Sequence, residues 1–243
     1  MGLLAFIWRL ALTTGTGSIF GFIVARQGYD AAIMAPMFII MSFAYGLAIY
    51  LLVLMFAFNS DERPVGDKIL VRLKNLLGVF VAAVLYFVTA YHITNLYGTE
   101  NHGVERFLLL DGGVYTRVFW IVQIGLGSLL PLVLLYSAAG RSRLWIGIAC
   151  LLVIIGGLAQ MYVIIIGGQA YPMELFPGKE YSSSFYDGVV ASYTPSLPEF
   201  VLGIGGVALA LAATVVGTRV LRFLPVSLAD EQVDPHRAAA DAA

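Results

Sequence analysis

The sequence predicts an all-α protein that crosses the membrane several times, as a polytopic bundle of about six transmembrane helices. Of the 243 residues, 60% are hydrophobic and 12% are charged, and that charged share is about half of what soluble domains carry. Several apolar stretches exceed the roughly 20 residues with which a helix crosses about 30 Å of hydrocarbon. Each stretch is expected to be helical, because a helix satisfies its own backbone hydrogen bonds in lipid.

The hydrophobic stretches follow one another along most of the chain. They cover about residues 2–24, 31–58, 73–97, 115–138, 144–167 and 199–222. We therefore expect a transmembrane domain over residues 1–222 and a polar, Ala-rich cytoplasmic tail over 223–243. The connections after the second, fourth and sixth stretches hold eight basic residues, and the other connections hold four. By the positive-inside rule, both termini are cytoplasmic, and the long aromatic loops 98–114 and 168–198 face outward.

Composition also argues against several kinds of site. A net charge of −1 gives no basic surface for nucleic acid. Of the three histidines, only His92 lies within a predicted helix, so a haem held by two histidines is not expected. The single cysteine, Cys150, cannot hold an iron–sulfur cluster, which needs about four such ligands. No tightly bound cofactor, metal ligand or catalytic residue is therefore predicted, and any redox role would use a diffusible organic carrier.

Polar and aromatic residues gather where the third and fourth predicted helices reach the outer surface. Helices joined by one loop usually lie side by side, so these residues are expected to line one pocket: Tyr91, His92, Asn95, Arg117, Trp120 and Gln123. Such a pocket suits a quinone headgroup, because it offers hydrogen-bond donors for two carbonyls, a proton source and apolar walls. The alternative is an ordinary interface, in which the aromatic residues form the interfacial belt, Arg117 extends to the surface and His92 bonds a neighbouring helix.

The segment Ser184–Phe200, SFYDGVVASYTPSLPEF, precedes the last predicted helix and is rich in aromatic residues and proline. Its first part, 185–193, is amphipathic and suits the membrane interface. Pro195 and Pro198 favour an extended entry and a helix start. Glu199 suits the positive end of the helix dipole, and we favour this capping role over that of a proton carrier. The segment therefore predicts a rigid outer platform and the start of the last helix.

Two parts of the sequence resemble the NrfD-like, polysulfide-reductase-type membrane anchors. The first is residues 12–52, beginning LTTGTG, which resemble the T-x-x-T-G helix of that family and the helix after it. The second is residues 163–209, which resemble the C-terminal signature of the family. Within the second part, we expect the following outer-loop residues to dock a partner subunit: Gln169, Tyr171, Pro172, Tyr193, Pro195, Pro198 and Glu199.

The resemblance implies a subunit of a respiratory complex in the cytoplasmic membrane of a bacterium or archaeon. Such anchors bind a ferredoxin-like iron–sulfur subunit, often with a molybdopterin or multihaem catalytic subunit, and serve anaerobic respiration. They exchange electrons between that partner and membrane quinone or quinol, without a redox metal of their own.

Family members usually have more helices, and this chain resembles the later ones, so the usual N-terminal helices are expected to be absent. The recognised quinone site of the family lies toward those helices, and its residues are not carried over to this chain. Three explanations stay open: another chain supplies the missing helices, the gene is divergent or truncated, or a second site binds quinone.

Two other functions also stay open. In the first, the chain is a purely structural anchor for the iron–sulfur subunit, and the quinone site lies on another chain. In the second, it is a small transporter, for which the Gly156–Gly157 pair in the fifth predicted helix is the one hint of a broken helix.

Overall fold

The computed structural model describes residues 2–60, 64–173, 179, 184, 188–221, 224, 225 and 227–230. Most of the predicted tail, 223–243, lies outside these residues, as do residues 185–187 of the predicted amphipathic segment. The chain forms two compact units. The first comprises Met1–Leu52 and Arg72–Ala191, and the second comprises Val53–Val71 and Ser192–Ala243.

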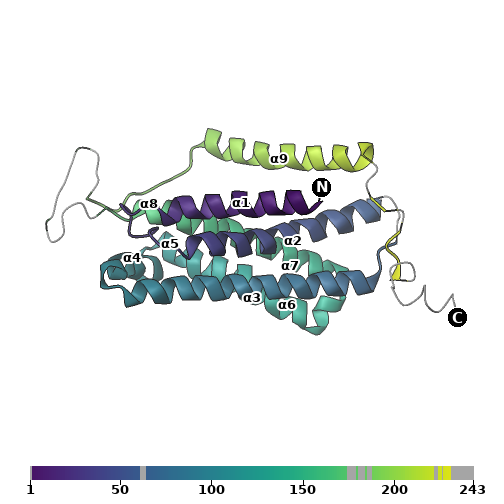
Figure 1. Ribbon diagram of the computed structural model, residues 1–243, viewed down its shortest axis with the longest axis horizontal. Helices are drawn as coiled ribbons and strands as arrows, with labels where there is room; N and C mark the ends of the chain where they lie inside the picture. The colour runs from purple at the N-terminus through teal and green to yellow at the C-terminus, as the bar shows by residue number, and fades with distance from the viewer. Residues whose placement is uncertain are drawn as a thin grey trace. The chain divides into compact units, whose positions relative to one another are not determined.

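The prediction of about six membrane-spanning helices is confirmed, because six helices among the described residues are long and apolar enough to cross a membrane. The first three are α1 (Gly2–Gly21), α2 (Met34–Ser60) and α3 (Asp67–Tyr97) (Figure 1). The fourth joins α5 (Val114–Arg117), a π-helical segment (Val118–Leu129) and α6 (Leu130–Tyr136). The fifth joins α7 (Arg143–Tyr162), a π-helical segment (Val163–Gly167) and α8 (Gly168–Ala170). The sixth is α9 (Leu197–Val220).

Short helical pieces connect α3 to the fourth span and the fourth span to the fifth. A 3-10 turn (Thr99–Asn101), α4 (His102–Arg106) and a π-helical segment (Phe107–Asp111) follow α3. A second 3-10 turn (Ala138–Arg141) follows α6. The described residues contain one β pairing, an isolated parallel bridge between Val65 and Leu228 in the second unit, so the described chain is all-α.

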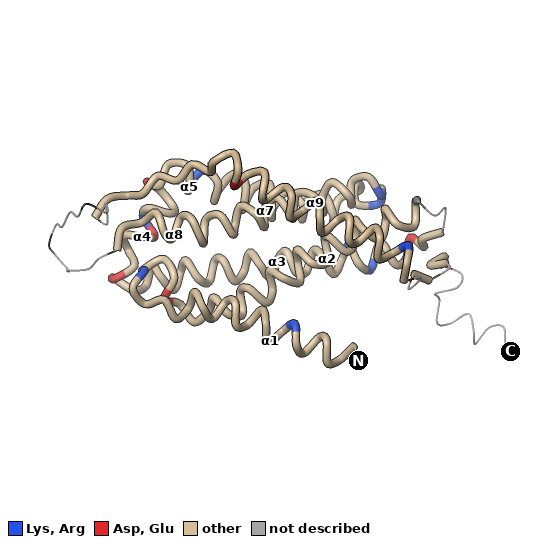
Figure 2. The backbone as a smooth tube through the Cα atoms, turned by 90° about the horizontal axis from the view of Figure 1, so that it is seen from above, with Lys and Arg blue, Asp and Glu red and all other residues tan. Residues whose placement is uncertain are grey.

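The apolar middle of the helices explains why they suit a membrane. No charged residue occurs in α2, and the charges of α3 are confined to residues 67–74, so both helices are tan through their middle in Figure 2. Helix α3 begins six residues before its predicted start at 73, because Asp67 in its first turn suits the helix dipole. Hydropathy alone does not register such polar first turns.

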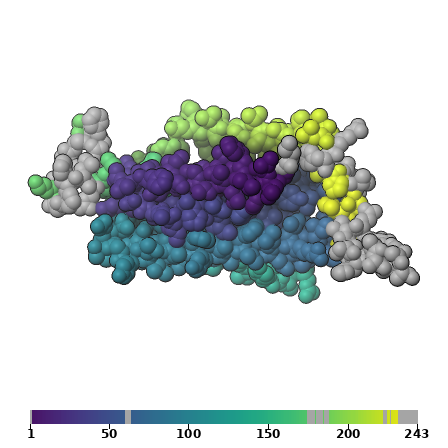
Figure 3. Space-filling view, viewed as in Figure 1, coloured from purple at the N-terminus to yellow at the C-terminus, as the bar shows by residue number. Residues whose placement is uncertain are grey.

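In the first unit, α1, α2 and α3 run lengthwise beside one another, and their side chains form adjoining bands on one face (Figures 1 and 3). Aromatic rings link the three helices: Phe43 of α2 stacks on Phe6 of α1 and on Phe80 of α3. At the start of α2, a Cβ added at Gly17 of α1 would lie 2.7 Å from the Met34 carbonyl oxygen. Glycine therefore permits the closest approach of these helices.

The Gly156–Gly157 pair lies in the middle of α7, which is continuous through both residues. Gly156 lies directly against Gly127 of the fourth span, and a Cβ at Gly157 would lie 2.7 Å from the ring of Tyr45. Small residues at such positions allow close helix packing in membranes. The pair that hinted at a broken transporter helix is therefore a packing contact.

Two polar contacts fix helix ends. In the first unit, Lys74 is buried, and its Nζ donates hydrogen bonds to the carbonyl oxygens of Leu135 (2.8 Å), in the last turn of α6, and Gly140 (2.9 Å), in the turn that follows. In the second unit, Glu199 accepts a hydrogen bond from the Ser196 backbone N–H at 2.7 Å within a capping box that starts α9. The predicted capping role of Glu199 is confirmed.

Candidate functional site

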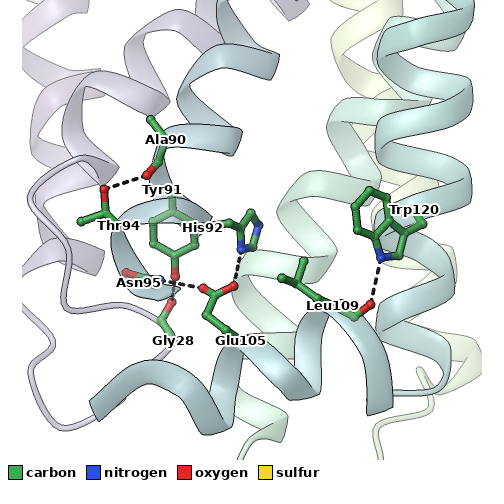
Figure 4. A network of polar contacts seen from close by, with 9 residues as sticks. All are labelled: Gly28, Ala90, Tyr91, His92, Thr94, Asn95, Glu105, Leu109 and Trp120. Carbon is green, nitrogen blue, oxygen red and sulfur yellow. Dashed lines mark hydrogen bonds and ion pairs between the residues drawn. The ribbon is translucent and has the colours of Figure 1, made fainter. Parts of the chain in front are cut away.

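The C-terminal end of α3 carries three of the predicted site residues, and α4 lies against it (Figure 4). His92 and Asn95 are three residues apart, so both face the same neighbour. That neighbour is Glu105 of α4: Nδ1 of His92 lies 2.6 Å from Oε2, and Nδ2 of Asn95 donates a hydrogen bond to Oε1 at 2.8 Å. The Glu105 side chain is fully buried, and that of His92 is 13% exposed.

The contacts of Glu105 compensate for the burial of its carboxylate. Burying a carboxylate is costly unless hydrogen bonds or a positive charge replace the lost water. Here His92 and Asn95 each contact one carboxylate oxygen. The 2.6 Å separation of Nδ1 and Oε2 places a short hydrogen bond between an imidazole and a carboxylate, two groups that can each carry a proton. Ionisable residues buried within a membrane protein are rare and usually functional.

A small cavity adjoins His92. Its volume of about 20 Å³ leaves room for about one water-sized group. Val88, Leu108 and Phe119 contribute apolar walls, and the Phe119 ring lies 4.9 Å from the His92 ring, centroid to centroid. The side chains that bring polar groups to the lining are Tyr91, His92, Gln123 and Gln160. The cavity therefore combines apolar walls with a few converging polar groups, as ligand sites do.

Two buried amide side chains in this lining have an unpaired atom. Oε1 of Gln123 and Nε2 of Gln160 have no hydrogen-bond partner within the described residues. The other end of the Gln160 amide is held, because the Tyr45 hydroxyl donates a hydrogen bond to its Oε1 at 2.6 Å. Unpaired buried polar atoms are uncommon and cost stability. Their presence beside an ionisable pair indicates a site that binds a polar group.

Both amides lie in or near π-helical segments. Gln123 is within Val118–Leu129, and Gln160 precedes Val163–Gly167 by one turn. A π-helical turn is wider than an α-helical one and frequently marks a functional site. It also shifts the direction of later side chains, and the Ser128 hydroxyl donates to the Gln123 carbonyl oxygen at 3.0 Å across this widened backbone.

The loop between α1 and α2 closes one side of the cavity through Gly28. The Tyr91 hydroxyl donates to the Gly28 carbonyl oxygen at 2.8 Å (Figure 4), and the Tyr29 hydroxyl donates to that of Ile165 at 2.7 Å. Burial raises the pKa of Tyr29, and the nearby positive charge of Arg26 offsets this only in part. Tyr29 therefore stays a hydrogen-bond donor at neutral pH, and the loop is fixed to both α3 and the fifth span.

The structure brings some of the predicted pocket residues together and leaves others apart. Tyr91, His92 and Gln123 line the cavity, and Asn95 binds Glu105. Arg117 and Trp120 are not among the lining residues. Arg117 is exposed, and the indole N–H of Trp120 donates to the Leu109 carbonyl oxygen at 2.9 Å, away from His92 (Figure 4).

The prediction of the pocket omitted Glu105 and Gln160. Glu105 stands in a polar loop sequence, GTENHGVERF, where an acidic residue is usually solvated. Its apolar neighbours Val104 and Phe107, both buried, were the available signal for a buried face. Gln160 forms an interhelical hydrogen bond with Tyr45 of α2.

The predicted docking residues fall in different compact units. Gln169, Tyr171 and Pro172 belong to the first unit, and Tyr193, Pro195, Pro198 and Glu199 belong to the second. Within the first unit, Nη1 of Arg26 donates to the Gln169 carbonyl oxygen at 2.7 Å. Within the second, the Tyr193 hydroxyl donates to Glu199 at 3.2 Å.

The fold and the site define a helical membrane protein with a buried histidine–glutamate pair at one end of α3. Comparison with known families is specific: the chain belongs to the family described as polysulphide reductase, NrfD, whose model matches residues 1–173. The resemblance noted in the sequence is thereby confirmed. No solved structure matches the chain.

Three curated relatives are each 29% identical to the chain. The Hdr-like menaquinol oxidoreductase integral membrane subunit of Archaeoglobus fulgidus aligns over 95% of this chain and 59% of its own length. A selenate reductase subunit of Mesobacillus selenatarsenatis aligns over 79% of this chain and 43% of its own length. A putative dimethyl sulfoxide reductase membrane subunit of Halobacterium salinarum aligns over 90% of this chain and 52% of its own length. The chain thus spans about half the length of the curated relatives it matches.

Proposed function

We propose that this chain is the membrane subunit of a multisubunit oxidoreductase and exchanges electrons between membrane quinol or quinone and an iron–sulfur partner subunit. The observation that carries the proposal is the buried His92–Glu105 pair beside a cavity with two unpaired amide atoms. The name of the Archaeoglobus relative, a menaquinol oxidoreductase subunit, supports a quinol as the ligand.

The chemistry of a quinol matches what the pair can do. Oxidation of a quinol to a quinone breaks two O–H bonds and releases two protons and two electrons. In the proposal, His92 accepts a proton from a quinol hydroxyl, and Glu105 stabilises the resulting imidazolium or takes the proton from Nδ1. The second proton leaves the other hydroxyl, which lies outside the cavity, and passes to water at its mouth. The electrons pass to an iron–sulfur cluster of the partner subunit, and quinone reduction is the same sequence in reverse.

The volume of the cavity limits how the headgroup binds. A space of about 20 Å³ holds one oxygen of the headgroup but not its ring, so the ring lies at the mouth of the cavity in this proposal. The same small volume favours a competing function, in which the chain is a structural anchor and the quinone site lies on another chain. The two functions differ in whether His92 matters for turnover.

The arrangement in the membrane is part of the proposal. Both termini face the cytoplasm, and the loops 98–114 and 168–198 face outward, which rests on the excess of basic residues in the other connections. The docking residues then receive the iron–sulfur subunit, together with a molybdopterin or multihaem catalytic subunit, on the outer side of a bacterial or archaeal cytoplasmic membrane. Two relatives named as reductase subunits support such an assembly.

The test compares two histidines in membranes that contain the complete complex. Reduction of the iron–sulfur partner by menaquinol is measured for wild type, His92→Ala and His102→Ala. His102 is an exposed residue of the adjoining loop, bound through Nε2 to the Leu96 carbonyl oxygen, and serves as the control. We expect His92→Ala to lower turnover by about 100-fold and His102→Ala to leave it unchanged. Wild-type turnover in both variants would favour the structural anchor.

A further inference from the structure

The two unpaired amide atoms of the cavity have opposite hydrogen-bonding character. Oε1 of Gln123 is an acceptor, and Nε2 of Gln160 is a donor. The two side chains are among the most buried polar groups of the described chain, with 4% and 2% exposure. Whatever occupies the cavity therefore meets a donor and an acceptor that water outside the protein does not reach.

The orientation of the Gln160 amide follows from Tyr45. The tyrosine hydroxyl donates to Oε1 at 2.6 Å, which leaves Nε2 for the cavity. Tyr45 itself is fixed by packing, because its ring lies so close to Gly157 that an added Cβ there would approach within 2.7 Å. Tyr45 is therefore the positioning residue that makes Gln160 a donor toward the cavity.

A donor and an acceptor in a space for one water-sized group specify the chemistry of the occupant. A bound hydroxyl satisfies both, because its hydrogen bonds Gln123 Oε1 and its oxygen accepts from Gln160 Nε2. Its hydrogen turns from Gln123 toward His92 only in the proton-transfer step of the proposed function. A ketone oxygen accepts from Gln160 but leaves the Gln123 acceptor buried and unpaired. A water molecule also satisfies both atoms, and a ligand hydroxyl can replace it without loss of hydrogen bonds.

We infer that the cavity selects the reduced, hydroxyl-bearing quinol over the oxidised quinone. The inference rests on the proposed function, since it takes the quinone site to be this cavity. Leaving one buried acceptor unpaired weakens binding by roughly ten- to hundredfold. The chain should therefore bind the quinol that much more tightly than the corresponding quinone, which suits a subunit that takes electrons from the quinol pool.

The experiment uses the full chain purified in detergent, with menadiol and menadione as soluble probes that share one ring system. Their dissociation constants are measured under anaerobic conditions from the quenching of tryptophan fluorescence. Trp120 is a suitable reporter, because its ring lies 4.9 Å from that of Phe119 in the cavity wall. We expect wild type to bind menadiol roughly ten to a hundred times more tightly than menadione.

Two matched variants separate the donor from the acceptor. Gln123→Met removes the acceptor at similar volume. The ratio of the dissociation constant of menadione to that of menadiol should therefore fall toward one. Gln160→Met removes the donor that both ligands use, so both should bind more weakly while the preference persists. Gel filtration checks that each variant is folded, and the wild-type ratio tests the inference without any variant.

The outcomes distinguish this inference from the proposed function. Equal affinities in wild type, or tighter binding of menadione, would overturn the inference. The proposed function would stand, because the chain would still bind a quinone. A preference for menadiol that survives Gln123→Met would also overturn it, because a group other than Gln123 would then make the selection. If wild type binds neither probe, both the inference and the proposed function are wrong.

Discussion

His92 and Glu105 lie 2.6 Å apart, Nδ1 to Oε2, although the glutamate side chain is wholly buried. The contact joins a helix that hydropathy identifies readily to a short loop helix that it does not. A histidine at the end of a membrane helix is ordinary by itself, because it can simply lie at the interface. Its buried carboxylate partner is the observation that supports the proposed role in proton transfer.

Glu105→Gln tests the carboxylate while keeping its shape. The amide can still accept from Asn95 and can donate to Nδ1 of His92, so the fold should persist. The variant cannot take a proton from the imidazole, and we expect quinol-linked turnover to fall about 100-fold with a changed pH profile. Glu100→Gln, at an exposed acidic residue in the preceding turn, is the control. An unchanged rate and pH profile for Glu105→Gln would remove the carboxylate from the mechanism.

Arg117 and Trp120 test whether the pocket extends as far as the sequence predicted. Neither lines the cavity, and the Trp120 indole bonds the Leu109 carbonyl oxygen. We expect Arg117→Gln and Trp120→Phe to keep quinol-linked turnover within about twofold of wild type, as exposed substitutions usually do. A large loss in either, measured in the same membranes as His92→Ala, would show that the headgroup reaches beyond the cavity.

The difference between the predicted and observed site has a physical cause. The C-terminal end of α3 and the start of the fourth span could be predicted from hydropathy. The placement of Tyr91, His92 and Gln123 near one another could be predicted because one loop joins the two helices. Which face Gln123 presents depends on a π-helical segment, and no local composition distinguishes π-helical from α-helical hydrogen bonding. Glu105 becomes buried only because α4 lies against α3, which is a tertiary contact that polarity in the loop does not reveal.

Lys74→Met tests the buried lysine of α3 that contacts the end of α6. The ammonium group bonds two carbonyl oxygens, those of Leu135 and Gly140, which a methionine would leave unpaired. We expect the free energy of unfolding in detergent to fall by about 2–3 kcal/mol. Arg72→Met, at an exposed position of the same helix, should change it by less than about 0.5 kcal/mol. Similar stability of the two variants would contradict a capping role for Lys74.

Tyr29→Phe tests the loop that closes the cavity. It removes the hydrogen bond to the Ile165 carbonyl oxygen, and we expect a loss of about 1 kcal/mol at neutral pH. Because burial raises the pKa of Tyr29 in the folded protein, its contribution is fully present below the ordinary tyrosine pKa of about 10 and is lost as the pH rises through the folded value. Thermal unfolding from pH 7 upward should therefore show wild type losing more stability than Tyr29→Phe above about pH 10. Parallel curves over the whole range would contradict this.

Gly156→Ala tests the close contact between the fourth and fifth spans. An alanine Cβ would collide with the backbone of Gly127, so the helices must separate, and overpacking of this kind costs about 1–3 kcal/mol. Gly46→Ala in α2 is the matched control, because a Cβ there meets no atom within 4 Å and alanine favours the helix. Separation of the two spans would also move Gln123 relative to Gln160, one on each span. We therefore expect Gly156→Ala to weaken menadiol binding and to lower thermal stability in detergent. Gly46→Ala should lower neither. A Gly156→Ala protein with wild-type stability would show that the contact between the two spans does not constrain the site.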